Sequence, residues 1–180
     1  MDRSPHLPRR RWLFAAAACA LPLAPGLARA APVRTLRLAH LHTGERLSVE
    51  YFSGGTYAAD AMAAVNRLLR DFRTGDVAPI DPGLLDQVHA LQQATGSSAP
   101  VEVISAFRSS RTNEALRGNG ERSGVARRSL HLEGRAIDIR LADVPLARLR
   151  EAALAMGRGG VGYYPGSNFV HLDTGRPRSW

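Results

Sequence analysis

The sequence predicts an α+β fold with a central, mainly antiparallel sheet flanked by helices. Segments with the alternating apolar and polar residues of β-strands gather near both ends of the chain, and segments with helical spacing lie between them. Because strands and helices come in unequal clusters rather than in strict alternation, a doubly wound parallel sheet is disfavoured. A chain of 180 residues is long enough for one domain with a proper core and short for two.

The first thirty residues have the pattern of a secretory signal peptide, which we place at 1–30. Arg9-Arg10-Arg11 precedes an apolar run that ends at Leu23, and Ala28-Arg29-Ala30 is a cleavage site of the A-x-A type. The paired arginines also resemble a twin-arginine signal, which implies bacterial export of a folded protein, with a plain Sec signal as the alternative. We therefore expect a periplasmic protein that has no transmembrane segment once the signal is removed.

Composition limits both the stabilising chemistry and the partners. The single cysteine, Cys19, lies in the leader, so the mature domain forms no disulfide and must be stabilised by core packing or a metal. The leader also accounts for half of the net charge of +8, with five arginines against one aspartate. The other arginines are spread along the chain without a basic stripe or interleaved aromatic residues, which argues against nucleic-acid binding. An anionic cell-surface polymer suits the charge equally well.

The expected domain, residues 31–180, begins with a β-hairpin. Residues 34–52 alternate apolar and polar side chains on both sides of Thr43-Gly44-Glu45, which supplies the turn. A helix is expected over 58–72, where apolar residues recur at helical spacing until Thr74-Gly75 ends the run.

Turn and cap residues divide the rest of the chain. Asp81 is a typical N-cap with Pro82 at the first helical position, and Gly118 and Gly157 are typical helix ends. Residues 119–128 have no period and contain two glycines, so we expect a mobile loop there. In chain order these signals predict a helix over 82–96, a strand over 101–107, a helix over 109–118, a strand over 136–141, a helix over 145–157, and closing strands over 161–164 and 168–174 with Pro165-Gly166 as their turn.

The strand expected over 136–141 presents a carboxylate on one face. Side chains alternate along a strand, so Ile137 and Ile139 share the core side and Asp138 points to the other. The same rule, applied to the last strand, turns Val170 and Leu172 inward. It places His171 and Asp173 together on the opposite face.

These residues offer donors for a metal. His131 lies in the approach to the strand that carries Asp138, and two imidazoles with one carboxylate make a protein shell typical of catalytic zinc, which leaves the fourth position for water. A structural zinc site would normally be closed, and the mature chain has no cysteine to close it. Spacing alone does not establish the site, because two histidines and an aspartate within forty residues also occur by chance.

The segment Ser129 to Leu141, SLHLEGRAIDIRL, is similar to the Ser-x-His-(x)6-Asp signature of the zinc peptidases of peptidoglycan. These are D-alanyl-D-alanine carboxypeptidases and L,D- or D,D-endopeptidases. Further segments resemble the branch of this family that contains the murein endopeptidase MepK, and they occur in the order of that branch. They are RDFRTG, IDPGLLDQVHALQQATG, VEVISAFRSSRTNEALR and GRGGVGYYPGSNFVHLDTGRPRSW, so the resemblance covers residues 57–180. It implies a hedgehog/DD-peptidase-like fold for a zinc peptidase domain at 31–180.

The resemblance also implies roles for individual residues. His131, Asp138 and His171 would be the ligands of Zn²⁺. Arg108, in SAFRS where relatives often have Ser-Gly-Tyr-Arg, would contact the substrate carbonyl or carboxylate as a catalytic residue. A structural arginine that ties the loop to the sheet is the alternative.

The general base does not follow from the family pattern. Relatives carry Glu or Asp three residues before the last histidine ligand, or a histidine two before it, whereas this chain has Asn168 and Phe169. We name Asp173 as the substitute base. Its alternative role is to orient His131 or His171 by accepting a hydrogen bond from the free ring nitrogen. Glu133 follows His131 closely but is expected to be exposed.

Two further segments could serve the substrate. Tyr163, Tyr164 and the glycine-rich stretch 157–162 could line a groove for a peptide stem, or pack at the sheet edge. The loop 119–128 could act as a lid that brings Arg122, Arg127 and Arg128 to acidic stems, or could simply be solvated.

The sequence is therefore interpreted as a periplasmic, zinc-dependent peptidoglycan endopeptidase that cuts peptide cross-links. The resemblance implies a preference for bonds at meso-diaminopimelate, with 3-3 cross-links as one candidate. A D-alanine carboxypeptidase, a zinc-containing cell-wall-binding module without turnover, and a purely structural exported domain remain the alternatives. Peptide stems of peptidoglycan are the expected partner, and the sequence does not define an oligomeric state.

Overall fold

The computed structural model describes residues 32–118, 126 and 128–180. The expected signal peptide at 1–30 lies outside the described residues, and so does most of the expected loop at 119–128. Within the described part, no helix has the length and apolar character needed to cross a membrane.

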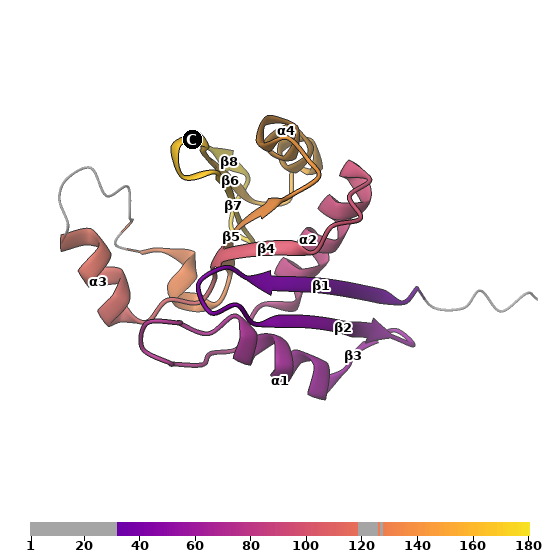
Figure 1. The fold of residues 1–180 in the computed structure, drawn as a ribbon, viewed down its shortest axis with the longest axis horizontal. Helices are drawn as coiled ribbons and strands as arrows, with labels where there is room; N and C mark the ends of the chain where they lie inside the picture. The colour runs from indigo at the N-terminus through magenta and orange to yellow at the C-terminus, as the bar shows by residue number, and fades with distance from the viewer. Residues whose placement is uncertain (1–31, 119–125, 127) are drawn as a thin grey trace, which may run out of the picture.

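The described chain contains a single mixed sheet and four α-helices (Figure 1). The strands are β1 (Arg34–His40), β2 (Arg46–Ser53), β3 (Thr56–Tyr57), β4 (Val101–Ser105), β5 (Ala136–Leu141), β6 (Gly160–Tyr164), β7 (Phe169–Asp173) and β8 (Arg178–Ser179). The helices are α1 (Ala59–Leu68), α2 (Pro82–Thr95), α3 (Ser110–Gly118) and α4 (Leu146–Met156), with short 3₁₀ turns η1 (Leu130–Glu133) and η2 (Pro165–Ser167).

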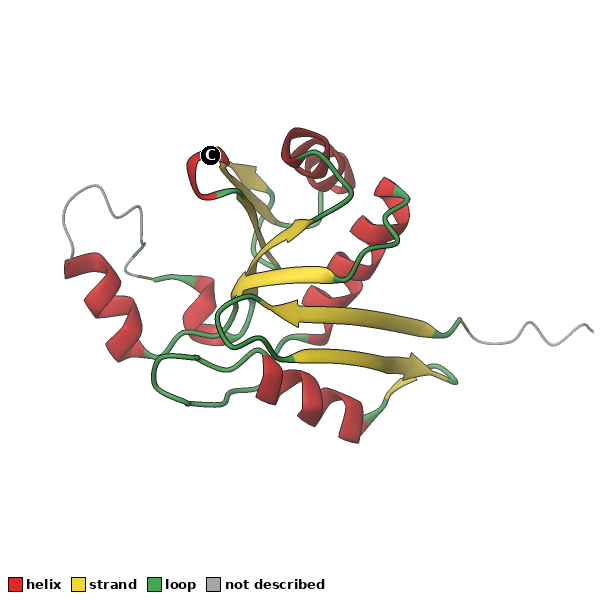
Figure 2. Cartoon of the chain, in the orientation of Figure 1, coloured by secondary structure: helices red, strands yellow, loops and turns green. Residues whose placement is uncertain are grey.

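The sheet has the strand order β3-β2-β1-β4-β5-β7-β6-β8. Its pairs are antiparallel except for β1 with β4 and β6 with β8, which run parallel. This arrangement confirms the α+β class with a mainly antiparallel sheet. The ribbon views show α3 standing apart from the other helices, near the end of the sheet where η1 leads into β5 (Figure 2).

The core lies on one face of the sheet. Inward residues of the central strands join residues of α1, α2 and α4 in one buried apolar cluster, which includes Leu38, Leu69, Leu85, Leu149 and Leu172. Ile137 and Ile139 belong to this cluster as expected, and so do Val170 and Leu172. The residues between them on β5 and β7 therefore face away from the helices, on the side where the donors gather.

Local signals explain most element boundaries. Asp81 accepts a hydrogen bond from the Gly83 amide at 2.8 Å, Pro82 begins α2, and Gly96 ends the helix with a φ of 68°. The expected hairpin is formed by β1 and β2, and the expected α4 ends at Gly157 in the left-handed conformation. The first helix ends at Leu68, four residues before the expected end, because residues 69–76 turn back on Asp71, whose backbone carbonyl accepts from Gly75.

Two elements were not predicted. β3 and β8 are only two residues long, so neither shows an alternating pattern in the sequence. β8 pairs with β6 and brings Arg178 and Trp180 to the face that carries Asp138 and His171.

Candidate metal centre

Strand pairing places two of the expected ligands opposite each other. Asp138 on β5 and His171 on β7 are direct partners in the antiparallel register. Directly opposite side chains lie on the same face of a sheet at close range. Both side chains are buried, and His171 Nδ1 lies 2.9 Å from Asp138 Oδ1.

A tight turn before β5 aims the third ligand. His131 lies in η1, which Gly134 ends in the left-handed conformation with a φ of 65°. A side chain at Gly134 would overlap the Pro79 carbonyl, so only glycine fits the turn. The His131 carbonyl accepts from the Arg108 amide at 3.1 Å, which ties η1 to the segment after β4.

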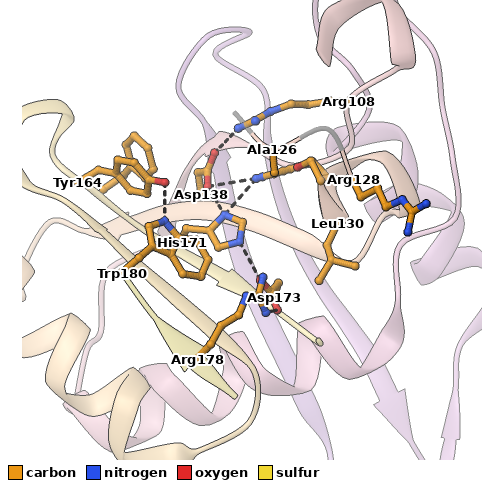
Figure 3. Close-up of a pocket in the computed structure, with 13 residues that line it drawn as sticks. Arg108, Ala126, Arg128, Leu130, Asp138, Tyr164, His171, Asp173, Arg178 and Trp180 are labelled. Carbon is orange, nitrogen blue, oxygen red and sulfur yellow. Dashed lines mark hydrogen bonds and ion pairs between the residues drawn. The ribbon is translucent and has the colours of Figure 1, made fainter. Parts of the chain in front are cut away.

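One donor atom from each of the three residues lies within 4.8 Å of the other two. Figure 3 shows Asp138 and His171 side by side in the pocket. His131 Nε2 lies 3.2 Å from His171 Nδ1 and 3.3 Å from Asp138 Oδ1. With the 2.9 Å between His171 Nδ1 and Asp138 Oδ1, these atoms form a nearly equilateral triangle. The geometry brings together the three residues that the sequence named as ligands.

The second nitrogen of each imidazole has its own acceptor. His131 Nδ1 lies 2.5 Å from the Ala106 carbonyl, so this nitrogen must carry the proton and donate it. His171 Nε2 lies 3.1 Å from Asp173 Oδ2 and donates to that carboxylate. Both rings therefore turn a lone pair towards the triangle, where the third atom is a carboxylate oxygen. Three such donor atoms at this range could hold a metal ion, and buried imidazoles oriented by outer acceptors are typical of metal ligands.

Burial and neighbouring charges set the ionisation of the three donors. Burial lowers the pKa of His131, and the Arg108 guanidinium lowers it further, which favours the neutral imidazole that binds metals. Burial acts to raise the pKa of Asp138, but His131, His171 and Arg108 outweigh it and hold the carboxyl well below its usual range. The pKa of His171 is raised, because hydrogen bonds to Asp138 and Asp173 outweigh its burial.

Comparison with known proteins identifies the family of the chain. The sequence model of the family described as peptidoglycan L,D-endopeptidase MepK matches residues 28–180. The chain is 46% identical over 147 residues to the peptidoglycan L,D-endopeptidase MepK of Escherichia coli (strain K12), covering 82% of this chain and 80% of the relative. It is 42% identical over 148 residues to the probable peptidoglycan L,D-endopeptidase MepK of Haemophilus influenzae, covering 82% and 78%.

The chain belongs to the peptidoglycan L,D-endopeptidase MepK family. The family resemblance stated from the sequence is thereby confirmed. A third relative of the same name, from Shigella flexneri, is likewise 46% identical over 147 residues.

In this MepK-family chain, Arg108 contacts the carboxylate of the triangle. Its Nη2 donates to Asp138 Oδ2 at 2.5 Å, and its Nε donates to Ser105 Oγ at 2.9 Å. The register between β4 and β5 shifts between Val103 and Ser105, so that Ser105 pairs with Asp138. Irregularities of this kind often re-aim side chains next to active sites. Arg108 also lines the pocket over the triangle, where a substrate oxygen could reach it.

Asp173 is enclosed on every side. It has no exposed surface, and its two oxygens receive five donors: the Gly160 and Gly175 amides, both terminal nitrogens of Arg178, and His171 Nε2. The hydrogen bonds, chiefly from His171 and Arg178, outweigh its burial and lower the pKa of Asp173. A side chain at Gly160 would overlap Asp173 Oδ2 and Arg178 Nη1, so the glycine makes room for this pair.

Aromatic residues from β6, from β7 and from the position after β8 form one wall of the pocket. The Trp180 indole donates to the Tyr164 hydroxyl at 2.7 Å and lies 5.2 Å from the His171 ring, measured between centroids. Tyr164 stacks on Phe169 at 4.6 Å. Of the two tyrosines considered for a groove, Tyr164 lines the pocket, whereas Tyr163 packs against the core because neighbouring residues of a strand face opposite ways.

Sequence reasoning missed Arg178 and Trp180. Neither residue lies in a segment whose sequence pattern indicates a strand. The signal that could have found them is the pair Gly160 and Gly162, which lie opposite Asp173 and His171 and leave room for other side chains. A side chain at Gly162 would overlap Trp180, so both glycines mark positions where β8 residues cross β6. Of the arginines named in the loop, Arg128 lines the pocket, and Arg122 and Arg127 lie outside the described residues.

Two other positions considered for the general base, those of Glu133 and Asn168, lie away from the triangle. Glu133 is exposed and pairs with Arg135 at 3.2 Å, as expected from its place in the turn. Asn168, at the position where relatives carry an acid, has a φ of 52° and lines a different cleft with Glu102 and Arg140.

Proposed function

We propose that this protein is a zinc-dependent peptidoglycan endopeptidase that hydrolyses peptide cross-links of murein. The observation that carries the proposal is the triangle of His131 Nε2, Asp138 Oδ1 and His171 Nδ1 beneath an open pocket. The relatives that match most of the chain are named peptidoglycan L,D-endopeptidases, which supplies the substrate class and the reaction type.

The donor set and its spacing fit zinc. With zinc-to-ligand distances of about 2.0–2.2 Å, ligand atoms at the corners of a tetrahedron lie about 3.3–3.6 Å apart. The three separations here, 2.9, 3.2 and 3.3 Å, approach that edge length. Two imidazoles and one carboxylate leave one tetrahedral corner free, which is the arrangement of catalytic rather than structural zinc.

When bound, zinc would supply a Lewis acid for the scissile carbonyl and lower the pKa of water at its open corner towards about 7. Arg108 holds Asp138 in place and presents the rest of its guanidinium to the pocket, where it can stabilise the negative charge that develops on the carbonyl oxygen.

For Asp173 we propose the orienting role rather than that of the base. Its oxygens already accept from five donors, and a carboxylate engaged in this way lacks a free lone pair for a proton from water. By accepting from His171 Nε2 it fixes the tautomer in which Nδ1 faces the triangle. Arg178, which binds both oxygens of Asp173, keeps that carboxylate ionised and in position.

Two finer features also belong to the proposal. The relatives' name specifies an L,D-endopeptidase, and we propose bonds at meso-diaminopimelate, including 3-3 cross-links, as the bonds cut. The leader pattern at 1–30 supports export to the periplasm, where this substrate lies.

Digestion of purified sacculi by the mature protein tests the function. We expect cross-linked dimers to be converted to monomers, with one zinc ion per chain by elemental analysis and no activity in His131→Ala. Loss of pentapeptides without loss of dimers would show a carboxypeptidase instead. One bound zinc with every muropeptide intact would show a binding module, and iron in place of zinc would reject the assigned metal.

A further inference from the structure

A second cleft carries two arginines that form no ion pair with the described residues. It is lined by Arg73, Thr74, Arg111, Thr112, Ala115 and Leu116, which come from the segment after α1 and from α3. The ion pairs found between described residues include neither Arg73 nor Arg111. The cleft thus combines two exposed guanidiniums with a floor formed partly by alanine and leucine.

The arginine on the α1 side is held in a fixed position. The Arg73 guanidinium carbon lies 4.2 Å from the centre of the Phe72 ring, within the range of a cation–π contact. Phe72 is itself stacked on His42, with 4.4 Å between ring centroids and 10° between planes. A guanidinium held over a packed ring loses less freedom when it binds an anion than a free surface arginine would.

A buried carboxylate connects this cleft to the metal centre. Asp71 accepts from the Arg73 amide at 3.0 Å and from the Ser109 amide at 2.9 Å, so it joins the segment of Arg73 to the residue that follows Arg108. Partial desolvation and repulsion from the nearby Arg108 guanidinium both lower the pKa of Arg73. The repulsion between the two guanidiniums and the shared contact with Asp71 place Arg73 close to Arg108, which lines the pocket over the triangle.

Among the described residues, no carboxylate lines the cleft or pairs directly with Arg73 or Arg111, although the charge of Asp71 partly offsets that of Arg73. Asp71 is buried and engaged by Ser109 and the Arg73 backbone. Asp76 accepts from the Thr74 hydroxyl at 2.7 Å. Glu114 lies on α3 but does not line the cleft. A carboxylate-bearing peptide with small aliphatic side chains fits two arginines that lack a direct carboxylate partner and lie beside alanine and leucine.

We propose that the Arg73–Arg111 cleft is a substrate subsite that binds a free carboxylate of a peptide stem next to the scissile bond. The inference rests on the proposed function, because that function supplies a substrate with free carboxylates and alanine side chains. An extended peptide spans about 3.3–3.6 Å per residue, so a stem of a few residues can reach past Arg108 into the cleft. The subsite would select acidic stems over amidated ones.

Binding can be measured without turnover. The probe is the uncross-linked peptide L-Ala-γ-D-Glu-meso-diaminopimelate, and its matched control is the same peptide with its carboxylates converted to amides. Calorimetry with the mature zinc-loaded protein is expected to show about tenfold or greater weakening for the amide, because hydrogen bonds to charged groups are the stronger ones. The weakening should shrink as salt is raised.

Arg73→Gln/Arg111→Gln is compared with Arg67→Gln/Arg148→Gln, a control pair with the same change of charge on α1 and α4. Arg67 and Arg148 are exposed and line neither cleft. We expect the first pair to lower the affinity for the acidic peptide about tenfold and to leave the affinity for the amide peptide unchanged. The control pair should change either affinity by less than about twofold. The melting temperature of the first pair should fall only slightly, because Arg73 loses its cation–π contact with Phe72 but neither arginine of the cleft makes an ion pair with the described residues.

Equal binding by the two double variants would overturn the subsite. In cleavage assays the subsite predicts a higher KM with an unchanged kcat for Arg73→Gln/Arg111→Gln. Cleavage of cross-links with the same KM in both variants would reject the subsite and leave the endopeptidase standing. Arginine-dependent binding by a protein that cuts no muropeptide would reject the endopeptidase and leave the subsite standing.

Discussion

Asp138 and His171 face each other across β5 and β7, with 2.9 Å between Oδ1 and Nδ1. This pairing fixes two donors through backbone hydrogen bonds of the sheet, so their separation does not depend on loop conformation. The third donor, His131, comes from a 3₁₀ turn that is itself tied to the segment of Arg108. A rigid set of donors of this kind is the basis of the first prediction.

Alanine substitution of His131, Asp138 or His171 should remove the metal. Each change deletes one of three donors, so we expect metal affinity to fall by more than the roughly 10–100-fold typical of changes to outer hydrogen-bond partners. Zinc content after dialysis against a weak chelator measures the effect. Glu133→Gln is the control, because Glu133 is exposed and pairs with Arg135. Full zinc content in any of the three alanine variants would contradict the assignment.

Arg178→Gln should weaken metal binding without touching a ligand. The change removes both charged hydrogen bonds to Asp173 and loosens the acceptor of His171 Nε2. We expect a 10–100-fold loss of zinc affinity and an altered visible spectrum of the cobalt-substituted protein. Arg176→Gln, two residues away in the chain, should leave both unchanged. An unaltered cobalt spectrum in Arg178→Gln would refute the orienting role of Asp173.

Gly160→Ala should disturb the same carboxylate from the other side. The added methyl group would overlap Asp173 Oδ2 and Arg178 Nη1. Overpacking a filled site typically costs about 1–3 kcal/mol, so we expect a lower melting temperature together with weaker metal binding. Gly166→Ala is the matched control, because a methyl group there meets nothing within 4 Å. Equal melting temperatures and equal metal binding in the two variants would show that the residues around Asp173 can shift to accommodate the methyl group.

Arg108→Gln should reduce turnover more than binding. Loss of one group that stabilises a developing oxyanion typically lowers kcat by about 100-fold or more. The variant is assayed at saturating zinc, because Arg108 also contacts Asp138. Ser105→Ala, which removes only the hydroxyl partner of Arg108 Nε, should have a much smaller effect. A normal kcat in Arg108→Gln would favour the structural alternative.

Asp71 should make folding stability sensitive to acid. Burial acts to raise its pKa, but hydrogen bonds from Thr112, Ser109 and Arg73 outweigh it and lower the pKa to about 2, from 3.8 for the free group. A lowered pKa contributes stability above pH 3.8 that is lost as the pH falls towards 2, about 2 kcal/mol in all. Denaturant unfolding between pH 5 and pH 2 should therefore show a smaller decrease in the free energy of unfolding for Asp71→Asn than for the wild type. Asp60→Asn, an exposed change on α1, should keep the slope of the wild type.

Much of the fold and of the donor set could be predicted from the sequence. Alternation along residues 136–140 and 169–173 was enough to place Asp138, His171 and Asp173 on one face, because side-chain direction in a strand depends only on position. The caps of α2 were equally local, since Asp81, Pro82 and Gly96 each act within one helical turn.

The environment of Asp173 could not be predicted in the same way. Whether this carboxylate is free to accept a proton depends on Arg178, which reaches it through the parallel pairing of β8 with β6. A two-residue strand is too short to show an alternating pattern, so the contact could not be expected from the residues alone. The contact between Arg108 and Asp138 could not be predicted either, because it depends on the shifted register of β4 against β5.

The sheet ends in two-residue strands on both sides, β3 at one edge and β8 at the other. A strand that short offers a foreign chain very few backbone groups to pair with. β3 pairs with β2 at Phe52 and Ser53, and β8 pairs with β6 at Gly160 and Val161. One of these two edge strands, β8, also carries the arginine that binds the acceptor of His171, so an edge of the sheet and the support of a candidate metal ligand are the same short segment.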